Sequence, residues 1–474
     1  MINDLFEKNL SILNIGLELF EKSLEKQRQE VYSVDWKPPA NGNLEIIELL
    51  STLDLKKIEE ANKEVLKIIN SGEPELIAVK PAKDLIKGMT KYTIGHAGPP
   101  IEWESMCGPL KGAILGAIVY EELAETLQEA EALVLENKIK FVSNHSMGAV
   151  GPMTGMITYS MPLLVVKNTI YGNCAYTTFN EGLGKVMRFG ANDSEVIARL
   201  KWLEKVLGPY LNKVLELSGP IPLKVIMSKA LTMGDEMHQR NVAASLLIAK
   251  ELMKYFTKVV DDKEMLYKIV EFISGNEQFF LNIALAAAKS ISDPAKNIPY
   301  STVVTAMSRN GTNFGIKISG MGDEWFEAPV NQPKGLYFPG YSEEDANPDI
   351  GDSAIVEVIG IGGFAMGASP AIIKFIGGDS VEEALDYSKN MRDICVGLSQ
   401  NLLIPNLDFM GTATGIDILK VIEIGVLPVI NTGMAHKNPG IGQVGAGIVT
   451  APYQCFEKAF YFFFEKYFKN EEIK

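Results

Sequence analysis

The pattern of apolar and polar positions divides this chain into three regions. In the first, two short apolar runs typical of strands, residues 11–16 (SILNIG) and 31–36 (VYSVDW), flank a helical pattern over residues 17–29. The pattern then predicts a helix near 54–70, a strand at ELIAVK, a loop at YTIGHAGPP, a helix over 112–137 and a strand at IKFVSN. This alternation predicts an α/β region.

The second region, from about residue 193 to residue 290, has continuous helical periodicity. Beyond Pro299 the chain becomes Gly-rich, with β-type runs at STVVTAM, NFGIKIS, DSAIVEVIGIGGFAM and VLPVI and a helical pattern near 381–403. We therefore expect a mixed α/β (α+β) multidomain fold. Its predicted parts, packed together, are an N-terminal α/β domain (1–192), a helical domain (193–298) and a C-terminal α/β domain (299–474).

Composition excludes several classes of protein. Of the 474 residues 47% are apolar and 22% are charged, which is ordinary for a folded globular protein. The net charge of −14 and the lack of a basic cluster argue against a nucleic-acid partner. The longest uncharged apolar stretch, residues 358–373, is shorter than the about 20 residues that a membrane-spanning helix needs.

Cysteine spacing and the N-terminal sequence indicate the cellular compartment of the protein. Four cysteines lie far apart with no C-x-x-C pair, which indicates neither a disulfide framework nor a zinc ribbon. The first residues include acids and lack the basic segment of a secretory signal. We expect a cytoplasmic protein with no membrane association.

The chain has only four histidines, and each stands in a segment rich in Gly, Pro or Asn. Histidine titrates near neutrality and is the commonest general acid or base. We take His96 (TIGHAGPP), His145 (SNHSMGAVGPM) and His238 (MGDEMHQRN) as candidate catalytic residues. The alternative for each is a structural histidine that is hydrogen-bonded within its loop.

Arginine is also scarce, with six residues, and three stand in unusual loop sequences: Arg188 (NEGLGKVMRFG), Arg240 (HQRN) and Arg309 (SRNGT). A guanidinium presents a planar fork that suits a carboxylate or a phosphate, so these are candidate anion-binding residues. The alternative is an ion pair with a nearby Asp or Glu.

Further candidates are polar residues of tight turns. Asn310, Gly311 and Thr312 follow Arg309 and resemble an anion-binding turn in their chemistry. Carboxamide and acid groups could pair with a ureido or amide group, and the candidates are Asn173, Asn180 and Glu181. Asparagine is also common in turns for purely structural reasons.

No metal site and no cofactor are expected. Asp235, Glu236 and His238 are close in sequence but lack the H-E-x-x-H spacing. An ion pair between Glu236 and Arg240, four residues apart, is the alternative interpretation of this segment. The Walker pattern is absent, and the G-x-G-x-x-G that begins at Gly440 does not directly follow a strand.

Many unusual strings of this chain, in the same order, resemble the YlbE-like family, also called AllG. They cover the chain from about residue 10 to residue 450 and include YTIGHAGPPIEWESMCGPLKGA, YGNCAYTTFNEGLGKVMRFGA, MGDEMHQRN, SRNGTNFGIKISGMGDEWF, DANPDIGDSAIVE and NTGMAHKNPGIGQVGAG. The resemblance implies a multidomain α and β architecture with a helical middle part. It also implies a subunit of oxamate carbamoyltransferase, which converts oxalurate and phosphate to oxamate and carbamoyl phosphate. It carries over no set of catalytic residues.

The resemblance further implies two companion proteins, an FdrA-like and a YlbF-like subunit, and it is compatible with a homo-oligomer. The Ser-Thr-Arg-Thr-Arg motif of aspartate-type transcarbamylases is absent, so similar chemistry would need a different site. Such a reaction needs sites for two anions, donors for a developing oxyanion and a general acid such as His96 or His238.

Three functions stay open at this point. The first is a carbamoyltransferase subunit whose activity depends on partners. The second is a non-catalytic scaffold or regulatory subunit that binds a small acid or a nucleotide beside an FdrA-like partner, and the third is an acyl-CoA or nucleotide-binding enzyme. For the first, we expect the active site between the N-terminal and C-terminal regions, with His96 and Arg309 lining one cavity.

Overall fold

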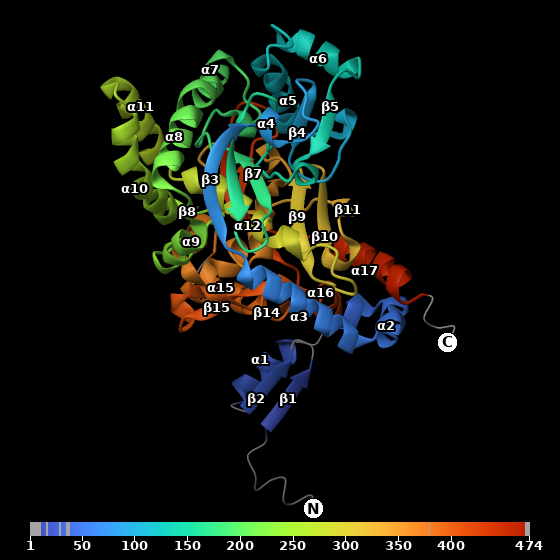
Figure 1. Ribbon diagram of the computed structural model, residues 1–474. Coiled ribbons are helices and arrows are strands. Elements are labelled where there is room, and N and C mark those ends of the chain that lie inside the picture. Colours follow the sequence, from blue (N-terminus) through green and yellow to red (C-terminus); the bar gives the residue numbers. More distant parts are fainter. Residues whose placement is uncertain (1–10, 16–17, 28–29, 35–37, 379, 470–474) are drawn as a thin grey trace, which may run out of the picture. The chain divides into compact units, whose positions relative to one another are not determined.

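The computed structural model describes residues 11–15, 18–27, 30–34, 38–378 and 380–469 (Figure 1). The chain forms two compact units. The first contains the described residues up to Leu53 together with residues 422–425, and the second contains the described residues of 54–421 and 426–469.

The first unit begins with a strand, a helix and a second strand, as the sequence pattern predicts. Strands β1 (Ser11–Ile15) and β2 (Glu30–Val34) pair in parallel, with α1 (Glu18–Lys26) between them in sequence. The ends of the predicted elements at residues 16–17, 28–29 and 35–36 lie outside the described residues. A 3-10 turn (Pro39–Gly42) precedes α2 (Leu44–Ser51), where the side chain of Asn43 caps the first turn of the helix.

The second unit starts with two sheets built from the N-terminal half of the chain. Helix α3 (Leu55–Ser71) leads to an antiparallel sheet with strand order β7-β6-β3-β8, and a parallel pair β4-β5 stands apart from it. The bounds are β3 (Pro74–Pro81), α4 (Ala82–Leu85), β4 (Thr93–His96), α5 (Gly108–Tyr120), α6 (Leu127–Leu135), β5 (Lys140–Ser143), β6 (Pro162–Asn168), β7 (Cys174–Thr178) and β8 (Ile221–Pro222).

Two local predictions for this part were wrong. The segment YTIGHAGPP begins as strand β4 because it pairs with β5, a partner far away in sequence. The single helix predicted over 112–137 is two helices, α5 and α6. The first ends near Glu122, which has a positive φ of 60°, and Thr126 then starts the second with a capping box to Glu129.

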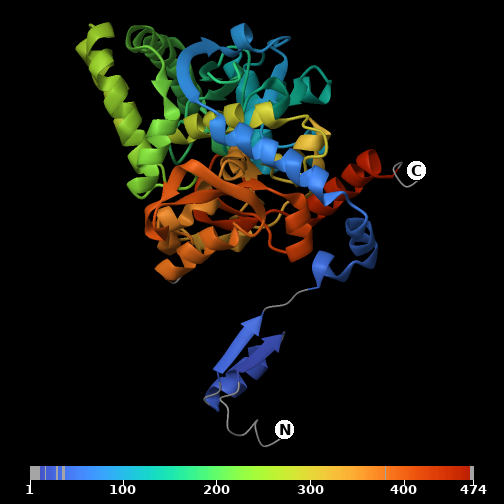
Figure 2. The same ribbon diagram turned by 60° about the horizontal axis from the view of Figure 1, so that its bottom comes forward.

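The helical region follows, as predicted, and its last helix lies in the core. Its elements are α7 (Ser194–Trp202), a π-helical turn (Leu203–Leu207), α8 (Gly208–Ser218), α9 (Leu223–Thr232), α10 (Val242–Val259), α11 (Lys263–Ser274) and α12 (Phe279–Ser292). Helices α10 and α11 lie side by side (green in Figures 1 and 2). Every residue of α12 is buried, and the helix packs against β6 and β7. A helix that is apolar on all sides is stable only as a core element.

The C-terminal third adds three more antiparallel sheets. Their strand orders are β11-β10-β9-β13, β12-β17-β16 and β14-β15. The strands are β9 (Val304–Asn310), β10 (Asn313–Ile318), β11 (Phe326–Pro329), β12 (Lys334–Tyr337), β13 (Ile350–Gly351), β14 (Cys395–Ile404), β15 (Met410–Ile416), β16 (Val429–Ala435) and β17 (Gln443–Thr450). The helices are α13 (Ile355–Val358), α14 (Ala371–Phe375), α15 (Val381–Asn390), α16 (Ile418–Ile424) and α17 (Tyr453–Tyr467).

Two predictions for this third were also wrong. The run DSAIVEVIGIGGFAM is helical, with a 3-10 turn at Asp352–Ala354, then α13 and a second 3-10 segment at Gly362–Ala368. The helix predicted over 381–403 ends at Asn390, because the rest of that segment pairs as β14 with β15. The periodicity of apolar runs of this length does not distinguish a strand from a buried helix, because a strand also needs a partner strand elsewhere in the chain.

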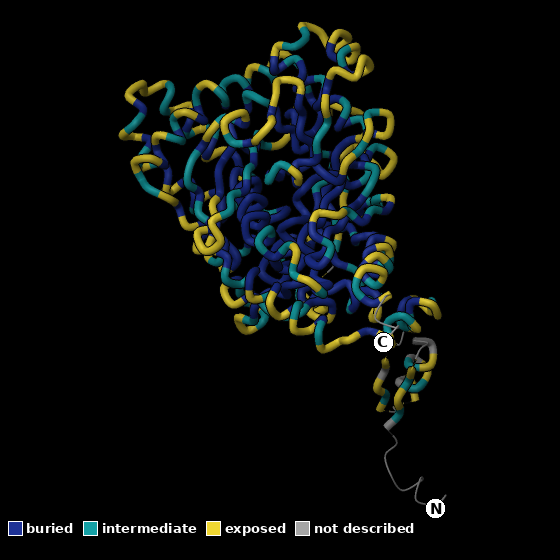
Figure 3. The backbone as a smooth tube through the Cα atoms, turned by 45° about the vertical axis from the view of Figure 1, so that its right-hand side comes forward, coloured by how far each residue is buried: buried dark blue, intermediate teal, exposed yellow. Residues whose placement is uncertain are grey.

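The boundaries predicted at residues 192/193 and 298/299 both fall inside the second unit. In Figure 3 the buried backbone, in dark blue, runs through the interior of this unit. Helix α12 from the predicted helical domain packs against strands from the predicted N-terminal domain. The division of this unit into three domains therefore stays a prediction. Within the described residues no helix combines the length and the apolar character that crossing a bilayer requires.

Candidate functional site

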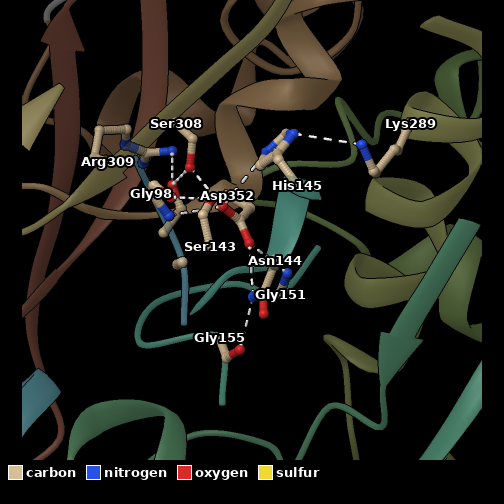
Figure 4. Close-up of polar contacts among 12 residues, drawn as sticks. Gly98, Ser143, Asn144, His145, Gly151, Gly155, Lys289, Ser308, Arg309 and Asp352 are labelled. Carbon is tan, nitrogen blue, oxygen red and sulfur yellow. Dashed lines mark hydrogen bonds and ion pairs between the residues drawn. The ribbon is translucent and has the colours of Figure 1, made fainter. Parts of the chain in front are cut away.

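A buried carboxylate, Asp352, joins loops from the first and last regions of the chain. Its side chain is fully buried at the start of the 3-10 turn after β13. It accepts hydrogen bonds from four groups: Gly98 N (2.9 Å), Gly151 N (2.9 Å), Asn144 Nδ2 (3.0 Å) and Ser308 Oγ (2.5 Å). Figure 4 shows Asp352 at the centre of these contacts. Burial by itself raises the pKa of Asp352, but the nearby His145 and the hydrogen bonds from Ser308 and Gly98 outweigh it and lower the pKa.

His145 lies beside this carboxylate in a setting that keeps it neutral. Its Nε2 is 3.5 Å from Asp352 Oδ1, and its Nδ1 is 3.5 Å from the Nζ of Lys289, which is bonded to Asp293 (Figure 4). Burial, followed by the charge of Lys289, lowers the pKa of His145 to about 4. The ring packs edge-on against Trp325. These contacts describe a structural histidine, so a catalytic role for His145 stays a prediction without support from this geometry.

This arrangement predicts a loss of stability in mild acid. The unfolded chain protonates His145 below its ordinary pKa of 6.5, whereas the folded chain does so only near 4, so acidification over this range favours unfolding. The expected loss is about 3 kcal/mol by pH 4. Asp352, whose pKa is lowered, loses its contribution only at more acidic pH. Denaturant unfolding of the wild type and of His145→Gln between pH 7.5 and 4.5 checks this, and equal pH slopes in the two proteins would contradict it.

Arg309 is also buried, and its guanidinium is fully engaged. Nε and Nη2 form a bidentate pair with Asp349 (2.7 and 3.1 Å). Nη1 donates to Gly351 O (2.9 Å) and Ser353 Oγ (3.2 Å), and Nη2 also donates to Thr432 Oγ1 (3.3 Å). The predicted direct contact of Arg309 with an anion is therefore not available in this structure. Instead, Arg309 fixes two hydroxyl groups, those of Ser353 and Thr432.

Those hydroxyls line a small cavity of about 20 Å³, the inner pocket. Segments from all three regions of the chain form its wall: Pro152, Met153, Arg188, Phe189, His238, Gln239, Gln278, Leu281, Ser353, Thr432, Gly433 and Gln443. Two residues with strained positive φ, Met153 (56°) and Met237 (62°), lie in or next to this wall. Strained backbone of this kind clusters at functional sites.

Arg188 supplies the positive charge of the inner pocket. It is 7% exposed, and it donates through Nε and Nη2 to Gly182 O (3.0 and 2.7 Å) and through Nη2 to Gln278 Oε1 (2.7 Å). Its Nη1 has no hydrogen-bond partner among the described residues. Burial lowers the pKa of Arg188 to about 10, so the side chain keeps its charge at neutral pH. The carboxylate of Glu181 accepts from the backbone N–H groups of Met187 and Arg188 and thereby holds this turn.

His238 is the histidine on the wall of the inner pocket. Its Nδ1 lies 2.7 Å from Oε1 of the buried Glu357, which also accepts from Gly363 N (2.9 Å). Because a carboxylate only accepts, Nδ1 carries the hydrogen and Nε2 of the neutral ring is the acceptor. No described residue bonds to that Nε2. Gly362 must lack a side chain here, since a Cβ would lie 2.1 Å from Glu357 Oε1.

A second buried carboxylate shapes the loop that carries His238. Oε1 of Glu236 accepts from the backbone N–H groups of Gln239 and Arg240, both at 2.6 Å, and Oε2 accepts from His238 N (3.1 Å). Burial raises the pKa of Glu236 to about 7. The segment DEMHQRN thus folds around its own glutamate, which replaces the predicted ion pair between Glu236 and Arg240. Arg240 lies next to Asp235 instead, with Nε 3.3 Å from Oδ1.

Two polar groups on the wall of the inner pocket have hydrogen-bonding capacity that no described residue uses. The carboxamide of Gln239, 9% exposed, forms no hydrogen bond with any described residue. Ser353 Oγ accepts from Arg309, and no described acceptor takes its own hydrogen. Donors and acceptors with unused capacity on one cavity wall suit a polar ligand or water.

The inner pocket adjoins a larger and more exposed cavity of about 250 Å³, the outer pocket. Both are lined by Gln239, Gln278 and Gln443. The outer pocket adds Leu183, Arg240, Asn241, Val242, Glu277, Phe338, Ala371 and Ile372. Because its wall contains exposed residues such as Leu183 and Glu277, we regard it as the entrance to the inner pocket.

The structure separates the other predicted residues from these pockets. His96 lines a different cavity with Glu102 and Trp103, and its Nδ1 donates to Ala97 O (2.8 Å), while burial lowers its pKa. Arg309 does not line that cavity. The backbone next to the two residues does meet, since a Cβ on Gly98 would lie 2.5 Å from Asn310 N. His96 and Arg309 therefore lie near each other without sharing a pocket, contrary to our expectation.

The predicted turn residues have structural partners. Asn310 caps the β9–β10 turn by accepting from Thr312 N and Asn313 N, and Thr312 Oγ1 donates to Ser105 O. Gly311 has φ +84°, which suits glycine. Asn173 donates to Ser290 O, and Asn180 donates to Asn282 Oδ1. Roles in substrate binding for these residues stay predictions. Among the described residues no group of three or more His, Cys, Asp or Glu side chains could hold a metal ion.

Sequence reasoning selected Arg188, Arg240 and His238, which line the two pockets, but missed three other residues at or behind their walls. Glu357, Ser353 and Thr432 stand in apolar or Gly-rich strings and have no distinguishing pattern. Gln239 could have been selected from the sequence, because it lies between His238 and Arg240, which were both selected.

Replacing Arg309 with lysine tests its supporting role. Lysine keeps the charge but cannot hold Asp349, Ser353 and Thr432 together, so we expect a loss of stability of about 2 to 4 kcal/mol. Denaturant unfolding measures this loss. The matched control is Arg199→Lys on α7, a partly exposed arginine, for which we expect a change below about 0.5 kcal/mol. An equal, small effect at both positions would contradict the assignment.

The comparisons with known proteins agree on one family. Residues 139–353 match the family described as oxamate carbamoyltransferase subunit AllG. The chain is 45% identical to oxamate carbamoyltransferase subunit AllG of Escherichia coli (strain K12) over 404 residues, which cover 85% of this chain and 96% of that protein. It is 44% identical to the uncharacterized protein YahG of the same organism over 471 residues, or 98% of this chain and all of YahG.

A solved structure has the same fold. It is the crystal structure of a conserved protein of unknown function from Enterococcus faecalis V583, which matches with a TM-score of 0.85 and 45% identity. The match covers 86% of this chain and 98% of that one.

Proposed function

Because this chain belongs to the family of oxamate carbamoyltransferase subunit AllG, we propose that it is the subunit that binds the ureido acid in a carbamoyl transfer. The reaction is the conversion of oxalurate and phosphate to oxamate and carbamoyl phosphate, carried out together with FdrA-like and YlbF-like subunits. The observation that carries the proposal is the inner pocket, which is lined by Arg188, Gln239 and His238, three side chains with hydrogen-bonding capacity that no described residue uses. At about 20 Å³ this pocket has room for about one water, so we infer that it widens toward the adjoining outer pocket of about 250 Å³ when the acid binds.

The chemistry of these groups matches the oxamate part of the substrate. Oxamate has a carboxylate next to an amide. A guanidinium N–H and a hydroxyl suit the carboxylate, and these are Nη1 of Arg188 and the hydroxyl of Ser353. A carboxamide offers one acceptor and two donors, so Gln239 suits the amide.

His238 suits the proton transfer that the reaction needs. An oxygen of hydrogen phosphate attacks the ureido carbon of oxalurate, the bond from that carbon to the oxamate nitrogen breaks, and the proton of the phosphate ends on the nitrogen. We assign His238 Nε2 to accept that proton and deliver it. The carboxylate of Glu357 holds the ring in the required tautomer and stabilises its protonated form.

Binding of oxamate to the isolated chain and carbamoyl phosphate formation by the assembled subunits test the proposal. For Arg188→Lys we expect the oxamate affinity to fall by about 10- to 100-fold, because lysine lacks the planar fork. Isothermal titration measures this affinity, and Arg199→Lys is again the control with no expected effect. A chain that binds no oxamate, alone or assembled, would contradict the proposed site.

The same assay separates this proposal from the scaffold alternative. A scaffold that binds a small acid would still titrate with oxamate. Substitution at His238, however, would leave the turnover of the assembly unchanged.

A further inference from the structure

We propose that a partner subunit closes the outer pocket and that a basic loop of that partner, rich in N–H donors, binds the phosphate group of the second reactant. This inference rests on the proposed function, because it concerns the second substrate of the same reaction. It follows from the charges of the two pockets and from the surface around their entrance.

The residues that line the two pockets carry little net positive charge. The charged side chains among them are Arg188 in the inner pocket and Arg240 and Glu277 in the outer pocket. Arg240 is already close to a carboxylate, with Nε 3.3 Å from Asp235 Oδ1. A phosphate dianion in the outer pocket would therefore lie near one arginine, whose charge Asp235 already balances, and near one glutamate, which repels it.

The nearby N-terminus of a helix does not supply the missing positive charge. Helix α10 begins at Val242 on the wall of the outer pocket, where its N–H groups could in principle bind an anion. Asp235, however, lies at this terminus and accepts from Ala244 N at 2.9 Å. Phosphate sites in proteins typically combine several cations with free backbone N–H groups. The described residues of the two pockets lack this combination.

The entrance carries exposed apolar side chains. Leu183, on the wall of the outer pocket, is 58% exposed. Ile441 is 42% exposed and precedes Gly442, which packs against the backbone of Gly184. Exposed apolar groups gathered at one place typically mark a protein interface.

Charge complementarity indicates the character of the partner. The chain has a net charge of −14, and Glu277 lies at the entrance beside these apolar groups. A partner surface with lysine or arginine would pair with Glu277 and bring the missing cations to the entrance. The carbamoyl group would then move between an acid held by this chain and a phosphate held by its partner.

The first experiment compares ligand binding by the isolated chain and by its assembly with the FdrA-like and YlbF-like subunits. We expect the isolated chain to bind oxamate but neither inorganic phosphate nor carbamoyl phosphate, and the assembly to bind all three. Phosphate binding, followed by ³¹P NMR, that occurs in the isolated chain and is lost in Arg240→Gln would overturn the inference.

The second experiment changes the entrance. Glu277→Lys and Leu183→Asp are expected to weaken assembly by at least about tenfold while leaving oxamate binding by the isolated chain unchanged. Leu217→Asp on α8, an exposed leucine outside both pockets, is the matched control. Normal assembly and turnover of both entrance variants would overturn the inference. If the wild-type assembly makes no carbamoyl phosphate, the proposed function fails instead, and the binding measurements still decide where phosphate binds.

Discussion

Under the proposed function, His238→Asn is expected to lower the turnover of the assembled subunits by about 10²- to 10⁴-fold, which is the usual contribution of a general acid or base. The asparagine amide can still donate to Glu357 in place of Nδ1, so the loop should keep its conformation. Nε2, to which no described residue bonds, is lost. Steady-state formation of carbamoyl phosphate from oxalurate and phosphate measures the effect.

Two controls show whether the loss is catalytic. The oxamate affinity and the thermal unfolding of His238→Asn should match those of the wild type. Glu357→Gln should lower turnover less than His238→Asn, because it keeps an acceptor for Nδ1 but removes the charge that stabilises a protonated ring. Wild-type turnover in His238→Asn would exclude this residue as the proton carrier.

Asp352→Ala is expected to destabilise the fold by about 3 to 5 kcal/mol, the largest stability effect that we predict. The substitution leaves two buried backbone N–H groups, those of Gly98 and Gly151, without their acceptor, and it also removes the partner of Asn144 and Ser308. These groups belong to loops from distant parts of the chain. The substitution should therefore loosen the junction between these loops.

Denaturant unfolding of Asp352→Ala measures this loss. Asp386→Ala on α15 is the matched control, because Asp386 is exposed and forms only a surface ion pair with Lys389. We expect a change below about 1 kcal/mol for the control. A similarly small change for Asp352→Ala would show that the loops are held together by their apolar contacts alone.

The sequence by itself determined where the long helices form, and it identified some residues of the candidate site. Long helices such as α3 and α10 have a repeat of apolar positions that holds whatever they pack against, and both appear where the pattern predicts them. The rare Arg188 and His238 were selectable because an arginine or a histidine in a Gly-rich loop is uncommon.

Only the tertiary structure decided which residues meet. β14 and β4 are strands because of partners far away in sequence, and no local pattern reports such a partner. Arg309 was selected as an anion-binding residue, but its guanidinium pairs with Asp349, forty residues away. It therefore holds the side chains of Ser353 and Thr432 in the wall of the inner pocket. His145 and His238 are alike in sequence context, yet His145 is buried beside Lys289 with a lowered pKa, while His238 lines a cavity. Residue type sets what a side chain can do, whereas its neighbours in space, which are fixed by long-range packing, set what it does.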